Sequence, residues 1–158
     1  MAQQLWLLRH GEAVPHESKP DAQRELTARG ERQSAAAGAA LARLGVEFAA
    51  VYTSPKTRAA DTARLACEAL NVKPEAEDVL ADGFEREDAL ELLGRHDAEA
   101  RVLVVGHDPS FSQVVHDLTG ARIDFKKGAV VAIRVEGSRG ELIVLLRPRE
   151  LESLAITD

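Results

Sequence analysis

Two histidines and two arginines follow three short apolar runs of the sequence. They are Arg9 and His10 after the first run, Arg58 one helical turn beyond the second, and His107 after the third. Arginine presents a rigid fork of N–H donors that matches the oxygens of a phosphate, and two arginines can largely neutralise a phosphoryl dianion. A neutral imidazole can attack phosphorus, while a second can donate a hydrogen bond to an equatorial oxygen. These residue types therefore predict a site that transfers a phosphoryl group to a histidine.

Such a site needs no metal ion, because arginines and helix N-termini already supply positive potential. We therefore expect no metal and no cofactor. The single cysteine, Cys67, also excludes an internal disulfide and any cysteine-rich metal cluster. It stands among Leu65, Ala66 and Leu70, which indicates a buried, small apolar side chain.

The apolar runs must be strands if they are to bring the four residues together. They cover residues 5–8, 49–53 and 102–105, and each is short and unbroken. Continuous apolar strands are typical of a parallel sheet that is buried on both faces. Ligand sites of open α/β sheets lie outside the carboxyl ends of the strands, so we expect both histidines and both arginines at one edge of the sheet.

Longer helical patterns alternate with the strands. Capping residues and apolar periodicity predict helices over 27–44, 54–70 and 108–118, the second with Ser54 as its cap and Pro55 at its first position. The acidic segment 75–96 predicts a loop followed by a helix over 86–94.

The order of the elements defines the fold class. Near the C-terminus, residues 129–135 and 141–146 flank a Gly-Ser-Arg-Gly turn and predict a hairpin at the sheet edge. We therefore expect an α/β protein, a three-layer α/β/α sandwich with a mostly parallel central sheet and an antiparallel edge hairpin. A chain of 158 residues fits one domain, which we expect to span residues 1–158.

Composition limits the partners. Twenty Lys and Arg against 26 Asp and Glu give a net charge of −6, so no global field attracts nucleic acid or an anionic membrane. We expect neither as a partner, and any anion site must be local. The apolar run near the N-terminus is too short for a signal peptide or a membrane span, and we predict a cytoplasmic protein.

The run Leu8-Arg9-His10-Gly11-Glu12 resembles the signature of the histidine phosphatase superfamily, which includes the cofactor-dependent phosphoglycerate mutases. Further similar pieces follow in order over roughly residues 4 to 119: Leu26-Thr27 with Gly30 and Gln33, Ser54-Pro55 with Arg58-Ala59 and Thr62-Ala63, and Gly106-His107 with Pro109. The resemblance implies that His10 is the nucleophile and that Arg9, Arg58 and His107 bind phosphate. The short chain is most similar to the small bacterial phosphohistidine phosphatases of the SixA type.

The general acid is ambiguous in this sequence. Relatives usually carry a carboxylic acid after the second arginine motif to protonate the leaving group, and Asp82 and Glu85 are the candidates here. An alkoxide leaving group benefits from such an acid, whereas an imidazole, with a reference pKa of about 6.5, leaves with much less help. A missing acid would thus point to phosphoamidates. Arg24 is a further candidate for binding acidic groups of the substrate.

Three functions follow from these residues. The first is hydrolysis of phosphohistidine or a related phosphoamidate, on a phosphorylated protein or a small phosphorylated compound, through a covalent phosphohistidine on His10. Its other ring nitrogen would be held by a backbone carbonyl. The alternative is a phosphomonoesterase for a small metabolite that uses Asp82 or Glu85 as general acid. A catalytically idle phosphate-binding module is a third possibility from another class.

Overall fold

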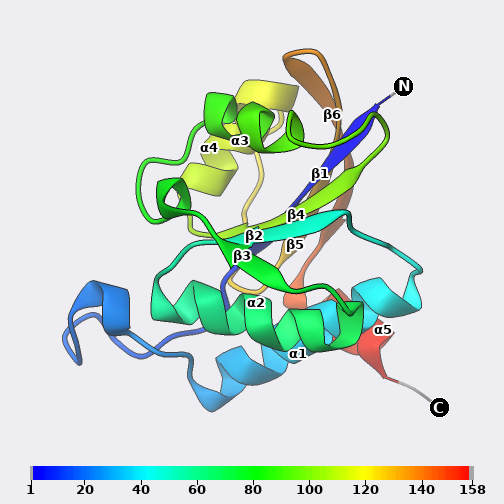
Figure 1. Cartoon of the computed structure of the whole chain (residues 1–158). Coiled ribbons are helices and arrows are strands. Elements are labelled where there is room, and N and C mark those ends of the chain that lie inside the picture. The colour runs from blue at the N-terminus through cyan, green and yellow to red at the C-terminus, as the bar shows by residue number, and fades with distance from the viewer. Residues whose placement is uncertain (1, 157–158) are drawn as a thin grey trace.

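The computed structural model describes residues 2–156 and is built around one six-stranded sheet. The strand order is β3-β2-β4-β1-β5-β6, and helices cover both faces (Figure 1). The predicted three-layer α/β/α architecture is confirmed.

Four parallel strands form the larger part of the sheet. They are β1 (Gln3–Arg9), β2 (Ala50–Thr53), β3 (Pro74–Ala76) and β4 (Arg101–Gly106). In the register of β1 with β4, Leu7 pairs with Val104 and Arg9 with Gly106. The central strands β1 and β4 are buried along most of their length, as continuous apolar runs require.

Two antiparallel strands complete the sheet. β5 (Val130–Glu136) pairs with β1, and β6 (Arg139–Leu146) pairs with β5 to form the predicted edge hairpin. Because β5 runs against β1, the start of β5 and the end of β6 lie at the carboxyl edge of the parallel strands. The chain segments before β5 and after β6 therefore also reach the edge where the site is expected.

One face of the sheet is covered by three helices. They are α1 (Ala28–Arg43), α2 (Thr57–Leu70) and α5 (Pro148–Ala155), which lie together below the sheet in Figure 1. Small residues dominate the contact, among them Ala37, Ala40, Ala59 and Ala63, and all four are fully buried. Trp6, Leu8 and Val105 from the sheet complete this apolar layer.

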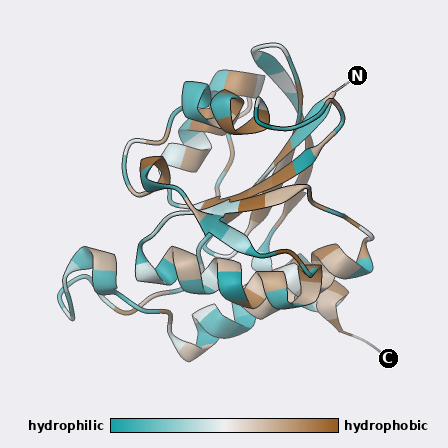
Figure 2. Ribbon diagram, in the orientation of Figure 1, coloured by the Kyte–Doolittle hydropathy of each residue, from teal (hydrophilic) through white to brown (hydrophobic). Residues whose placement is uncertain are grey.

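The opposite face is covered by α3 (Arg86–Leu93) and α4 (Ser110–Thr119). Phe111 is fully buried and packs against Phe84 and Phe125, with ring centroids 5.9 Å apart in both pairs. Figure 2 shows hydrophobic residues along the central strands and a mixture of hydrophilic and hydrophobic residues along the helices. The core thus consists of two apolar layers, one on each side of the sheet.

The predicted start of the second helix is wrong. α2 begins at Thr57 with Lys56 as its N-cap, and Ser54 and Pro55 lie in the turn before it. The Ser54 hydroxyl contacts His107 and accepts a hydrogen bond from the Lys56 backbone N–H, so it stabilises the turn rather than the helix end.

The helix predicted over 108–118 begins two residues later than expected, at Ser110. The Asp108 carboxylate before it accepts hydrogen bonds from the backbone N–H and the hydroxyl of Ser112.

The prediction also missed short elements. These are β3, the helix α5, and two 3-10 turns at Asp21–Gln23 and Asp78–Leu80. β3 and the two 3-10 turns are three residues long, which is too short for a periodic apolar pattern, whereas α5 has eight residues and a proline at its start that the prediction did not use. Across residues 2–156, none of the helices combines the length and the hydropathy needed to cross a bilayer.

Candidate active site

The carboxyl ends of β1, β2 and β4 meet at one point of the sheet edge. The His10 backbone N–H donates to the Gly106 carbonyl at 3.0 Å, and the Ser54 N–H donates to the Val105 carbonyl at the same distance. These bonds continue the sheet pairing by one residue beyond each strand. They bring His10, Ser54 and His107 together, as the sequence predicted for the two histidines.

The imidazole of His10 is buried and held in one orientation. Its Nδ1 lies 2.7 Å from the Gly11 carbonyl oxygen, and its side chain is 6% exposed. A carbonyl can only accept, so the proton is on Nδ1 and Nε2 carries the lone pair. Arg58 Nε lies 3.4 Å from this Nε2, beside the atom that would attack phosphorus. The contact with a backbone carbonyl is the one that the sequence analysis expected.

Both histidines of the site are neutral at pH 7. Burial, followed by the charges of His107, Arg58 and Arg9, lowers the pKa of His10 to about 3, although the Gly11 carbonyl opposes the shift. Burial and the charges of Arg58 and Lys56 lower the pKa of His107 to about 4. A neutral imidazole is the nucleophilic form, and the surroundings keep His10 in that form over the whole neutral range.

His107 faces His10 from the end of β4. The two ring centroids are 5.2 Å apart, and His107 Nε2 lies 2.8 Å from the Ser54 hydroxyl oxygen. Ser54 Oγ accepts from the Lys56 N–H and can give its own proton to His107 Nε2, which leaves the ring proton on Nδ1. Among residues 2–156, that Nδ1 is buried without a hydrogen-bond partner. His107 therefore has a buried ring nitrogen that is free to donate.

Arg58 lies in the first turn of α2 and is 6% exposed. All three of its nitrogens are engaged. Nε points to His10, Nη1 donates to the Asp21 carbonyl at 2.8 Å, and Nη2 lies 3.4 Å from the Asp21 carboxylate. The guanidinium is thus fixed beside His10 by residues far apart in the sequence.

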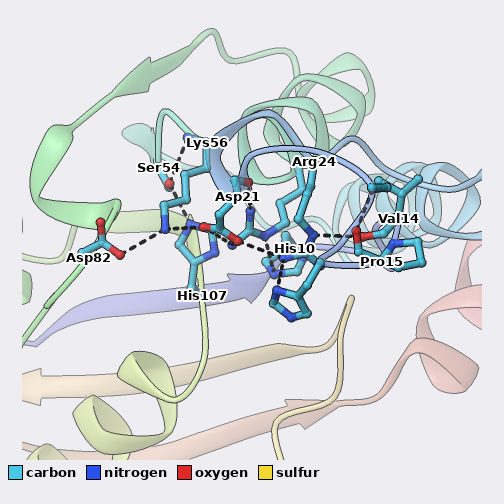
Figure 3. Close-up of polar contacts among 12 residues, drawn as sticks. His10, Val14, Pro15, Asp21, Arg24, Ser54, Lys56, Asp82 and His107 are labelled. Atoms are coloured by element: carbon cyan, nitrogen blue, oxygen red, sulfur yellow. Dashed lines mark hydrogen bonds and ion pairs between the residues drawn. The ribbon is translucent and has the colours of Figure 1, made fainter.

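A network of opposite charges supports Arg58 (Figure 3). The Asp21 carboxylate binds Lys56 Nζ at 2.9 Å and Arg24 Nη1 at 3.0 Å, and Lys56 Nζ also binds Asp82 at 3.0 Å. The hydrogen bonds from Lys56 and Arg24 hold the pKa of Asp21 well below its usual range. Burial lowers the pKa of Lys56, but its bonds to Asp21 and Asp82 outweigh that effect and raise it. Asp21 is therefore ionised and Lys56 protonated at pH 7.

Sequence reasoning missed Asp21, Ser54 and Lys56 as members of the site. Lys56 had a usable signal, because it precedes Arg58 by two residues in the turn that follows β2. Asp21 had almost none, since it belongs to a polar loop whose path from Gly11 to Thr27 no periodicity describes. Ser54 was interpreted as a helix cap, which concealed its contact with His107.

Arg9 approaches the site from the other side. Its Nη1 donates to the Phe125 carbonyl at 2.6 Å, and its Nε is buried without a partner among the described residues. Burial lowers the pKa of Arg9, with Asp108 and Asp124 acting in the opposite direction, but a guanidinium stays charged in proteins. The unpaired Nε gives Arg9 a free donor at the edge of the sheet.

Backbone packing fixes the loop that carries His10. The Gly11 N–H donates to Thr62 Oγ1 at 3.1 Å, and the Glu12 N–H donates to Gln33 Oε1 at 2.9 Å. A Cβ on Gly30 would overlap the Glu12 carbonyl oxygen, so the first turn of α1 lies directly against this loop. The separate motif pieces of the sequence thus pack together around the turn that carries His10.

The remaining candidate site residues lie at the rim of the site or among the residues that hold Arg58 in place. Asp82 is ion-paired to Lys56 while its side chain is 86% exposed, and Glu85 is the exposed N-cap of α3, where it forms a capping box with Asp88. Arg24 is 5% exposed, and its Nε donates to the Val14 carbonyl at 2.9 Å. Its contacts hold the loop and Asp21 in place, and direct binding of substrate by Arg24 stays a prediction. No group of three or more potential metal-ligating side chains occurs within the part of the chain that the structure describes.

The fold and the motifs place this chain in a known family. Residues 5–84, about half of the chain, match the model of the histidine phosphatase superfamily (branch 1), and the protein belongs to that superfamily. It is therefore a phosphatase of this family, as the sequence analysis predicted.

Individual relatives agree with the family. A structure of the protein histidine phosphatase SixA complexed with tungstate superposes with a TM-score of 0.84 at 25% identity, covering 94% of this chain and 99% of that one. The mycobacterial glucosyl-3-phosphoglycerate phosphatase Rv2419c shares the fold, with a TM-score of 0.75 at 17% identity over 91% of this chain and 98% of its own. An uncharacterized protein of Picosynechococcus sp. is 30% identical over 162 residues, which cover 94% of this chain and 98% of the relative.

Proposed function

We propose that the protein hydrolyses phosphohistidine or a related phosphoamidate through a phosphohistidine intermediate on His10. The observation that carries the proposal is the state of the carboxylates around the site. Asp21 and Asp82 are both bound to Lys56, and Glu85 caps α3. Lys56 and Arg24 keep Asp21 ionised, and Asp82 and Glu85 are engaged in an ion pair and a helix cap, so the site favours a leaving group that departs without a strong general acid.

The geometry supports a nucleophilic role for His10. Its Nε2 carries the lone pair, and Arg58 Nε stands 3.4 Å from it. In-line attack forms the bond from Nε2 to phosphorus as the bond from phosphorus to the substrate imidazole breaks, and the leaving imidazole takes a proton from solvent. Water then attacks the same phosphorus and releases inorganic phosphate, which regenerates neutral His10.

Three neighbouring side chains would hold the phosphoryl oxygens. Arg58 is already fixed beside the nucleophile, and Arg9 and His107 each have a buried nitrogen that lacks a protein partner among the described residues. Donors that are positioned before the reaction stabilise the charge of a transition state without reorganisation. We assign Arg9, Arg58 and His107 this role.

The SixA similarity agrees with this substrate class, because that relative is named a protein histidine phosphatase. The proposal is tested by mixing the protein with a phosphohistidine peptide labelled in the phosphoryl group and stopping the reaction with alkali within milliseconds, since phosphohistidine survives base. The label should be found on the tryptic peptide that contains His10, and His10→Ala should carry none. Turnover without labelled protein, or equal labelling of His10→Ala, would contradict the covalent mechanism.

A phosphomonoesterase is the second candidate. One observation favours it: Asp82 reaches the rim of the site through Lys56, which also binds Asp21 beside Arg58. A substrate that displaced this ion pair could receive a proton from Asp82. Ester hydrolysis that exceeds phosphohistidine hydrolysis, and that is lost in Asp82→Asn or Glu85→Gln, would establish this function instead.

A further inference from the structure

An open pocket of about 530 Å³ lies at Arg9. It adjoins the proposed phosphoryl site, which comprises Arg9, His10, Arg58 and His107. Its walls come from the end of β1, the first turns of α1, the segment before β5 and the start of α5. Six basic side chains line it against two acidic ones, in a protein whose net charge is −6. The basic residues are Arg9, Arg29, Lys126, Lys127, Arg147 and Arg149.

The pocket is tied to the nucleophile through the backbone. Gly128 N–H donates to the carbonyls of both Arg9 and His10 at 3.0 Å, so the residue that follows Lys127 contacts the backbone of the nucleophile. The charge of Arg9 contributes to the lowered pKa of His10. The charge of Asp124, which lines the pocket, opposes the lowering of the pKa of Arg9 by burial. A group bound in the pocket would therefore lie beside the loop that carries His10.

Several of the positive charges are available to a ligand. Arg147 is bound to Glu150 at 2.8 Å, and Lys126 to the exposed Asp124 at 2.9 Å. Lys127 has no carboxylate oxygen within 4.0 Å among residues 2–156, and Arg149 is 79% exposed with its nearest carboxylate at 3.8 Å. The pocket thus keeps a net positive charge after its internal ion pairs are formed.

We propose that this pocket binds acidic side chains next to the phosphohistidine of a protein substrate. The inference rests on the proposed function, and it adds that the enzyme selects phosphoproteins with acidic residues around the modified histidine. Long, exposed lysine and arginine side chains suit such a task, because they can follow carboxylates on a protein surface without requiring one fixed geometry.

The test compares two phosphohistidine peptides of equal length, one with Asp and Glu beside the modified histidine and one with Asn and Gln. The wild-type protein, K126Q/K127Q and the matched control K73Q/R139Q are compared. The control removes two exposed cations at the starts of β3 and β6, at the end of the sheet away from the pocket. In the wild type, kcat/KM should be about tenfold higher for the acidic peptide at low salt, as a few partly screened ion pairs provide.

That preference should fall to about twofold or less in K126Q/K127Q and persist in K73Q/R139Q, while the neutral peptide is hydrolysed equally by all three. Equal rates for both peptides in the wild type, or an undiminished preference in K126Q/K127Q, would overturn the inference and leave the proposed function intact. If no phosphohistidine peptide is hydrolysed, the proposed function fails. Fluorescence anisotropy of the labelled, unphosphorylated acidic peptide then decides the inference: weaker binding to K126Q/K127Q than to the control supports it, and equal or absent binding overturns it.

Discussion

The phosphoryl site and the neighbouring basic pocket are built in opposite ways. In the phosphoryl site, His10 and Arg58 are each 6% exposed, and they contact each other, the Gly11 carbonyl and Asp21. In the pocket, Lys126 and Arg149 are 59% and 79% exposed and are paired only with other surface groups. Arg9 belongs to both regions.

The difference matches two different tasks. Chemistry requires an attacking atom and charge-stabilising donors held close to their final positions, and burial with backbone contacts achieves that. Recognition of a protein surface instead tolerates mobile side chains, because steering depends on charge more than on exact placement. Substitutions in the first region should therefore change the rate for every substrate, whereas those in the second should change only the choice of substrate.

The largest effect is expected at Arg58. Arg58→Ala removes the guanidinium beside His10 Nε2 together with its contacts to Asp21, so kcat/KM should fall by about 10²- to 10³-fold. Arg64→Ala on the same helix, whose side chain is 59% exposed, is the matched control and should change the rate less than twofold. Steady-state kinetics on a neutral phosphohistidine peptide measures kcat/KM for both variants. Equal values for Arg58→Ala and Arg64→Ala would contradict the special role of the buried site.

The second effect tests the packing of the loop that carries His10. Gly30→Ala places a methyl group on the Glu12 carbonyl and should lower the free energy of unfolding by about 2 to 3 kcal/mol, with a loss of activity as His10 shifts. Gly94→Ala at the end of α3, where a Cβ meets nothing closer than 3.3 Å, should change stability by less than about 1 kcal/mol. Urea unfolding of both variants provides the measurement, and a stable, active Gly30→Ala protein would show that the loop is not held by this contact.

The third effect concerns acid. The pKa of His10 is about 3 in the folded protein against an ordinary value of 6.5, so the unfolded chain binds a proton between these values that the folded chain does not. His10 thus contributes stability that is present above pH 6.5 and is lost as the pH falls. The free energy of unfolding of the wild type should decrease more steeply from pH 6 to pH 4 than that of His10→Ala, by up to about 1.4 kcal/mol per pH unit. Parallel curves from urea titrations at several pH values would refute the buried, neutral histidine.

The smallest effect separates the two candidate chemistries. Asp82→Asn and Glu85→Gln should each change kcat/KM for phosphohistidine by less than about twofold, because an imidazole leaves without a strong acid. Glu85→Gln retains a side chain that can cap α3, so its fold should persist. A loss of more than tenfold in either variant would identify an acid and favour ester hydrolysis.

Much of the fold was predictable from the sequence because strands β1, β2 and β4 are continuous apolar runs and α1 carries both a cap and a regular stripe. The residues at the strand ends followed from these assignments. The supporting charges did not, since Asp21 reaches Arg58 through a loop with no periodic pattern, and Ser54 occupied a position that also suits a helix cap. The basic pocket was hidden for another reason: its cations come from four segments of the chain that only the folded sheet edge brings together.

The most direct test of the central claim compares hydrolysis of a phosphohistidine peptide and of an alkyl phosphate ester, side by side, by the wild type and by His10→Ala. Our account predicts faster release of phosphate from the peptide than from the ester, and no release above background by His10→Ala. Faster release from the ester, or full activity of His10→Ala on the peptide, would contradict it.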